Sequence, residues 1–127
     1  MANVIKLNAF SRVRFSMSDY IIQPISSASL VPFKFDGRIL FSSDNVELIH
    51  LTLQPGEGMD QHIQPLDVVF FVLEGTGSLL VGEDMLIITV NTTVYVKEGA
   101  YRSWTNNGPG PLRILVYKLI KQQALPG

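Results

Sequence analysis

The sequence of 127 residues contains no cysteine. Disulfide bonds, a thiolate nucleophile and a thiolate metal site are therefore excluded. It also lacks an excess of one charge, because 10 Lys and Arg residues nearly balance 11 Asp and Glu residues. Neither sign gathers into a run that would neutralise a phosphate backbone or an anionic bilayer. We therefore expect no nucleic-acid partner and no membrane partner.

Long apolar runs are also missing. No stretch is long enough to cross a bilayer. The first ten residues mix Asn3, Lys6 and Asn8 with apolar positions, unlike the apolar core of a secretory signal. With the lack of cysteine, this composition leads us to expect a cytoplasmic protein. The length suits one compact domain, and no shift in composition along the chain suggests a second.

What the sequence does contain is a series of short apolar, β-branched and aromatic runs separated by Gly, Pro, Asn and Asp. Helical spacing is hardly visible. The pattern predicts an all-β sandwich or barrel. We expect an N-terminal arm (1–37), a barrel core (38–120) and a C-terminal tail (121–127) within one domain. The expected strands are 38–41, 46–53, 68–73, 78–81, 85–89, 93–96, 102–105 and 112–120.

The expected strand at 68–73 is apolar on both of its alternating faces. A strand with one face in water would carry polar residues at every second position, so both faces are expected to be buried. The barrel interior covers one face. The other face needs the rest of the chain or a second subunit. A homodimer is therefore expected, with a central strand covered by its own chain as the alternative.

Two stretches carry Gly, His and Asn at fixed intervals. Residues 55–77 resemble the first motif of the cupin family, in which a Gly is followed by His-x-His, then a Glu, then a second Gly. Residues 91–106 resemble the second cupin motif. The resemblance covers residues 46–117 and implies a jelly-roll β-barrel, the double-stranded β-helix. The matching residues are Gly56, His62 and Gly75 in the first motif, and Gly99 and Asn106 in the second.

The family's metal ligands are mostly replaced. By position, Gln64 stands for the second His, Val68 for the Glu and Arg102 for the motif-two His, which leaves only His62. A catalytic divalent metal generally needs about three imidazole or carboxylate ligands. Arg102 would also place a fixed positive charge where the cation sits in the family. We therefore expect no metal and no cofactor at this site. Asp67, next to the lost Glu, should point to the opposite face of its strand.

The resemblance places His62, Gln64 and Arg102 together in the mouth of the barrel. Alternation along the strands adds Phe70 and Trp104 to the same cavity. A mainly apolar pocket with a few polar groups is typical of a small-ligand site. These five residues are therefore the predicted ligand-binding residues.

Arg102 needs a partner, because an unpaired buried guanidinium is energetically costly. One alternative is a carboxylate or phosphate of a ligand, held by the planar guanidinium group. The other is a protein carboxylate, such as Glu47 or Glu57, which would make the cluster a structural plug.

The leading functional hypothesis is a binding or sensing protein for a small organic molecule, anionic if Arg102 binds it directly. The rival is an enzyme, either a metal-free isomerase or epimerase that uses His62 for proton transfer, or a metal-dependent oxygenase or isomerase. His62 also suits a hydrogen-bonding wall residue, since no carboxylate lies at motif spacing to orient it. A purely dimerising scaffold is a third hypothesis. His50 is expected on the outer face of its strand, outside the site.

Overall fold

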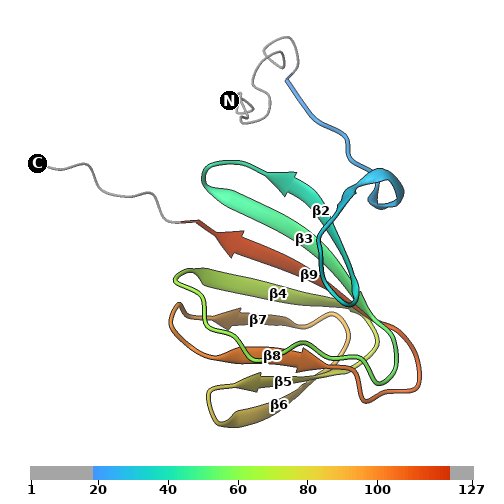
Figure 1. Cartoon of the computed structure of the whole chain (residues 1–127), viewed down its shortest axis with the longest axis vertical. Coiled ribbons are helices and arrows are strands. Elements are labelled where there is room, and N and C mark those ends of the chain that lie inside the picture. The colour runs from blue at the N-terminus through green and yellow to red at the C-terminus, as the bar shows by residue number, and fades with distance from the viewer. Residues whose placement is uncertain (1–18, 121–127) are drawn as a thin grey trace, which may run out of the picture.

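The structure, a computed structural model, describes residues 19–120, which form two antiparallel β-sheets (Figure 1). The larger sheet has the order β1-β2-β3-β9-β4-β7, and the smaller sheet has the order β6-β5-β8. The strands are β1 (Ser29–Leu30), β2 (Asp36–Ser42), β3 (Val46–Leu53), β4 (Asp67–Glu74), β5 (Gly77–Val81), β6 (Asp84–Ile88), β7 (Thr93–Val96), β8 (Arg102–Thr105) and β9 (Leu112–Leu119).

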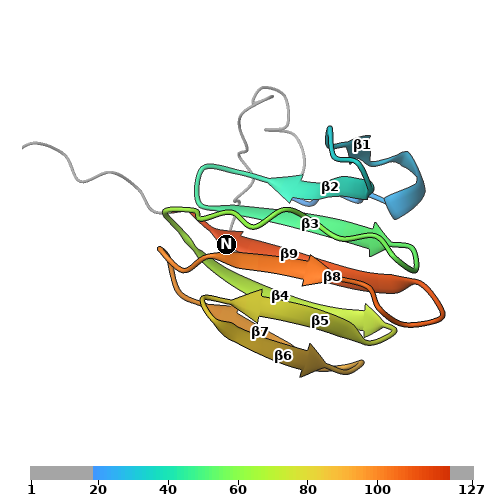
Figure 2. The same ribbon diagram turned by 60° about the horizontal axis from the view of Figure 1, so that its bottom comes forward.

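The all-β prediction is confirmed. Each of the eight expected strands is present, and the only helical element in the described residues is a 3-10 turn, η2 (Ile25–Ser27). None of the helical structure in residues 19–120 is long and apolar enough to span a membrane. The two sheets face each other (Figure 2). The apolar runs become strands because their alternate side chains form the core between these sheets. These core side chains come from all strands of the barrel except β1 and β2.

The connection between β3 and β4 does not loop out into solvent. It runs beside β8 and forms isolated bridges that pair Gly58 with Thr105 and His62 with Arg102. The His62 N–H donates to the Arg102 carbonyl at 3.2 Å, and the Arg102 N–H donates to the His62 carbonyl at 3.0 Å. The connection thereby extends the smaller sheet and places the residues of the first motif directly against those of the second.

The described part of the N-terminal arm folds back over the sheet edge. β1 pairs with β2, and Nη1 of Arg38 donates to the carbonyls of Ile25 and Ser26 at 3.2 Å each. A Cβ at position 37 would overlap the Val31 side chain and lie 2.8 Å from the Phe33 ring, so Gly37 permits this close approach. β2 begins at Asp36, just before the expected start of the barrel core. Residues 1–18 of the arm and the tail 121–127 lie outside the described residues.

β4 is apolar on both faces, and the two faces differ in burial. Its inner residues Val68, Phe70 and Val72 are buried, whereas the alternate residues are half-buried. Within residues 19–120, the expected burial is therefore complete on the inner face of β4 and partial on its outer face. A second subunit covering the outer face, and hence the homodimer, stays a prediction.

His50 lies on the outer face of β3, as predicted, because the alternating residues Ile49 and Leu51 belong to the core. It is nevertheless buried rather than solvated, at 3% exposure. Its Nε2 accepts a hydrogen bond from Nε of Arg113 at 3.1 Å, so the neutral ring carries its proton on Nδ1. Burial, followed by the charge of Arg113, lowers the pKa of His50 from its ordinary value of 6.5.

We expect this histidine to make stability pH-dependent. Below about pH 6.5 the unfolded chain takes up a proton that folded His50 resists, so the free energy of unfolding should fall as the pH drops from about 7.5 to 5.5. His50→Gln keeps a hydrogen-bond acceptor but cannot titrate, and should flatten this slope in urea denaturation. Comparison at about pH 8, where His50 is neutral in both states, gives the structural cost of the substitution. An unchanged slope in the variant would contradict the assignment.

Candidate functional site

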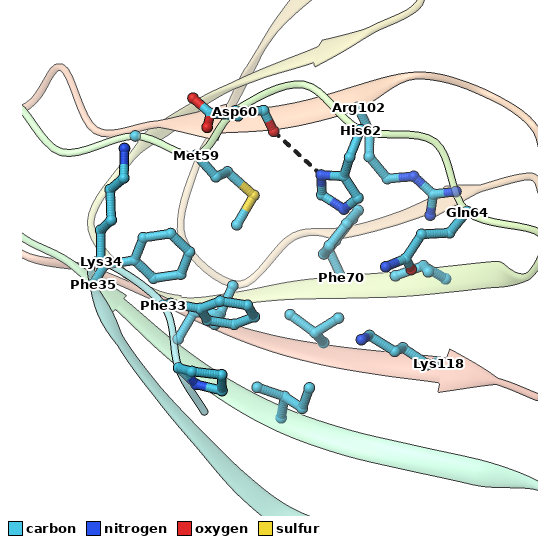
Figure 3. Close-up of a pocket in the computed structure, with 16 residues that line it drawn as sticks. Phe33, Lys34, Phe35, Met59, Asp60, His62, Gln64, Phe70, Arg102 and Lys118 are labelled. Carbon is cyan, nitrogen blue, oxygen red and sulfur yellow. Dashed lines mark hydrogen bonds between the residues drawn. The ribbon is translucent and has the colours of Figure 1, made fainter. Parts of the chain in front are cut away.

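A cavity of about 410 Å³ opens on the inner face of the larger sheet (Figure 3). Strands β3, β4 and β9 form its floor, and the β3–β4 connection, the arm and the first residue of β8 form its walls. Its volume falls within the range of about 300–1,000 Å³ that is usual for small-molecule sites. The lining residues are Pro32, Phe33, Lys34, Phe35, Ile49, Leu51, Gly58, Met59, Asp60, His62, Gln64, Val68, Phe70, Arg102, Val116 and Lys118.

Arg102 is the charged side chain buried most deeply in this wall, at 1% exposure. Its Nε donates to the Ala100 carbonyl at 3.4 Å and its Nη2 to the Leu66 carbonyl at 3.5 Å, both of them long contacts. Its Nη1 has no hydrogen-bond partner among the described residues. Burial lowers the pKa of Arg102, and the charge of Asp67 acts in the opposite direction. The guanidinium remains charged, since arginine does not deprotonate in proteins.

The predicted protein partners of Arg102 are engaged elsewhere. Glu47 forms an ion pair with Nζ of Lys118 at 3.6 Å, and Oε1 of Glu57 accepts the Gln54 N–H at 2.7 Å. Arg102 forms no ion pair within residues 19–120. The prediction of a plug in which Glu47 or Glu57 pairs with Arg102 is therefore wrong, because each of these carboxylates binds another donor.

His62 and Gln64 both line the cavity, as predicted. Nδ1 of His62 lies 3.2 Å from the Asp60 carbonyl, which can only accept a hydrogen bond. The neutral ring therefore carries its proton on Nδ1 and leaves Nε2 as an acceptor. Figure 3 shows the Gln64 amide beside the Arg102 guanidinium, at the same end of the cavity.

Phe70 and Trp104 differ in their position. Phe70 lines the cavity, whereas Trp104 is fully buried behind it and is absent from the cavity wall. The two rings meet edge to face with centroids 5.4 Å apart, an arrangement that aromatic pairs favour. Alternation along β8 correctly predicted that Trp104 points inward. The ring packs into the core between the sheets, however. Trp104 therefore packs against Phe70 from the core side and does not contact the cavity.

Sequence reasoning missed the contribution of the arm and of Lys118. Phe33 and Phe35 line the cavity, although the arm keeps no regular apolar period. A signal was available for Lys118, which continues the inward alternation of Ile114 and Val116 on β9. No comparable pattern marked the arm, whose position depends on contacts with β2.

Residues 49–118 match the family model of the cupin domain. The chain belongs to the cupin family. No protein of curated function matches the sequence.

The cytoplasmic location expected from composition stays a prediction.

Several solved structures share the fold. TT1209 from Thermus thermophilus is 24% identical, with a TM-score of 0.66 over 75% of this chain and 91% of that one. A predicted oxalate decarboxylase from Thermotoga maritima is 15% identical, with a TM-score of 0.72 over 80% of this chain and 100% of that one. An RmlC-like cupin from Shewanella frigidimarina is 10% identical, with a TM-score of 0.71 over 80% and 92% of the two chains. These similarities show the double-stranded β-helix fold and leave the function open.

This cupin keeps the turns of its motifs. Gly75 and Gly99 have φ values of 84° and 87°, and Asn91, at a glycine position of the second motif, has a φ of 63°. These are left-handed conformations, which Gly adopts freely and Asn tolerates better than most residues. The backbone of the cupin motif is therefore retained.

The metal-ligand set of the family is not retained. Among residues 19–120, no three His, Cys, Asp or Glu side chains are grouped so that they could hold a metal ion. At the motif positions, His62 is joined by an amide, the apolar Val68 and the cationic Arg102. Oδ1 of Asp67 accepts the Glu98 N–H at 2.9 Å, and Asp67 does not line the cavity. The residues present do not fit the family's metal site.

Proposed function

We propose that this cupin binds a small organic anion through Arg102, in a pocket that works without a metal ion. One observation carries the proposal: a guanidinium buried to 1% exposure in the cavity wall has a nitrogen, Nη1, with no partner in the described part of the chain. A buried charge without an ion-pair partner is costly, and an anion in the cavity would provide that partner and the missing acceptor.

The groups around Arg102 suit a carboxylate. The planar guanidinium can donate two parallel hydrogen bonds to the two oxygens of a carboxylate. Gln64 adds an amide that donates through its nitrogen. Lys118 adds a positive charge on the same wall, although Glu47 compensates it. At the polar end of the cavity, donors and positive charge thus outweigh the acceptors, which are Nε2 of His62 and the Gln64 carbonyl, and this favours an anionic ligand.

The catalytic alternative has less support. Nε2 of His62 is an available acceptor, as a general base requires. The ring is oriented by a backbone carbonyl instead of a carboxylate that would stabilise the imidazolium after proton uptake. Binding needs only the groups already described, whereas catalysis needs this further one. Binding or sensing is therefore the function that the geometry supports best.

Arg102→Met tests the proposal. Isothermal titration calorimetry with a panel of small carboxylates, sugars and phosphates should find a carboxylate that binds the wild type, and the variant should bind it about tenfold more weakly or worse. Methionine nearly fills the space of the alkyl stem and removes an unpaired buried charge. The free energy of unfolding without ligand should therefore stay equal or rise. Equal affinity of the two proteins for every carboxylate would contradict the proposal.

A further inference from the structure

We propose that the ligand of this pocket is an aryl carboxylate, a flat aromatic ring bearing one carboxylate, with the ring held by Phe33 and Phe35 of the arm and the carboxylate by Arg102. The inference rests on the proposed function and adds the chemical class of the ligand. It follows from the charge of the cavity, the composition of its walls and the position of the arm.

The charges of the cavity favour a single negative charge on the ligand. The charge of Lys118 is paired with Glu47 at 3.6 Å. Lys34 and Asp60 line the cavity with opposite signs. The lining cations Lys34, Arg102 and Lys118 thus outnumber the lining Asp60 and the ion-paired Glu47 by one positive charge among residues 19–120. Asp67, outside the lining, acts on Arg102 through its charge but forms no ion pair with it. A carboxylate brings one charge, whereas a phosphate monoester carries about 1.5–2 negative charges at neutral pH. The monocarboxylate matches the cavity better.

The walls favour an apolar body on that ligand. Nine of the sixteen lining residues are apolar, so the hydroxyls of a sugar would be buried without enough hydrogen-bond partners. Phe70 is fixed against Trp104 at an interplanar angle of 83°, and Phe33 and Phe35 lie with ring centroids 4.8 Å apart. Three phenyl rings around one cavity offer faces and edges on which another aromatic ring packs well.

The two phenylalanines of the arm lie at one end of the cavity. Figure 3 shows Phe33 and Phe35 at the end of the cavity away from Arg102 and Gln64. Lys34 and Asp60 also lie toward that end, with opposite signs, so a ligand that reaches both ends meets the guanidinium at one end and two phenyl rings at the other. Phe33 is 45% exposed, so a ring placed against it would bury apolar surface that is now in contact with water. Both residues precede the cupin match at 49–118, and the preference belongs to this chain rather than to the family domain.

The test compares carboxylates with and without a ring. Isothermal titration calorimetry with 2-naphthoate, benzoate, acetate and inorganic phosphate is performed on the wild type, on the double variant Phe33→Ala/Phe35→Ala and on Tyr20→Ala. Tyr20 is an aromatic residue of the same arm, 71% exposed and outside the cavity wall. The wild type and Tyr20→Ala should bind 2-naphthoate about tenfold or more tightly than acetate. The double variant should lose that difference and keep its affinity for acetate.

The outcomes separate the two proposals. If acetate or phosphate binds the wild type as tightly as 2-naphthoate, or if the double variant keeps the preference for the ring, the aryl carboxylate is overturned while Arg102 remains an anion site. If no probe binds the wild type, or if Arg102→Met binds 2-naphthoate with unchanged affinity, the proposed function itself fails. Thermal unfolding of the double variant checks that it is folded, which is expected because Phe33 is half-exposed.

Discussion

Replacing Asn106 with alanine is expected to lower the free energy of unfolding by about 3 kcal/mol, because it breaks three side-chain hydrogen bonds in a fully buried position. Nδ2 of Asn106 donates to the carbonyls of Leu53 at 2.8 Å and Gly110 at 2.9 Å. Its Oδ1 accepts the Gly108 N–H at 2.9 Å. Alanine would leave these backbone groups without partners, and water cannot reach all of them.

The main chain of Asn106 makes two further hydrogen bonds, which alanine would keep. Its N–H donates to the Glu57 carbonyl at 2.9 Å, and its carbonyl accepts the Gly56 N–H at 2.8 Å. Asn106 thereby joins the end of β3, the β3–β4 connection and the turn before β9. The neighbouring Asn107 provides a matched control, because it is exposed and donates a single side-chain bond, to Oγ of Ser78 at 3.1 Å.

Urea denaturation of the two alanine variants measures the difference. Asn107→Ala should lose about 1 kcal/mol or less, as expected for one partly buried hydrogen bond. If both variants lost the same free energy, Asn106 would not be the residue that holds these three segments together. The match to the cupin motif identified the position of Asn106, but the motif did not state which carbonyls it would bind.

The strands could be predicted from the sequence because their signals are local. Alternating apolar residues and turn-forming Gly, Pro, Asn and Asp act over a few residues, so the boundaries of β3, β7 and β8 were predicted without error. The left-handed φ of 63° at Asn91, where the second motif has a glycine, was found only in the structure. Burial on the outer face of β4 depends on what lies against that face, which no local pattern records.

The site could be predicted in part. His62, Gln64, Phe70 and Arg102 line the cavity, as the motif predicted. The pleat sets the direction of Phe70 on β4, whereas His62 and Gln64 lie on the β3–β4 connection, which bridges β8 at Arg102. Trp104 also points inward, but an inward direction does not distinguish the pocket from the core behind it. The partner of Arg102 depended on which donors lie nearest to each carboxylate, a long-range property.

The position of the arm could not be predicted from the sequence, for a related reason. Phe33 and Phe35 reach the cavity because the chain packs closely on Gly37, where a Cβ would overlap Val31. Gly37 stood in the expected arm, next to the first expected strand, and a lone glycine there does not name what would approach it closely. The wall that favours a ring on the ligand was therefore visible only in the structure.

Gly75→Ala is expected to have the largest effect on stability, about 4 kcal/mol or more. Gly75 closes the first motif with a φ of 84°, a conformation that costs alanine about 1 kcal/mol on its own. A Cβ there would also overlap the Pro111 carbonyl oxygen and lie 3.2 Å from Cα of Leu112. These are backbone atoms at the start of β9, which is paired with both β3 and β4 and cannot move alone.

Gly82→Ala separates the two contributions. Gly82 also has a positive φ, of 60°, but a Cβ there would meet nothing within 4 Å. Its loss in urea denaturation should be about 1 kcal/mol, the conformational part alone. A Gly75→Ala protein that is far less stable than Gly82→Ala, or that does not accumulate in a folded form, agrees with steric contact against a rigid β9. Equal losses would mean that the turn before β9 yields to the methyl group, so Gly75 would serve only the backbone conformation.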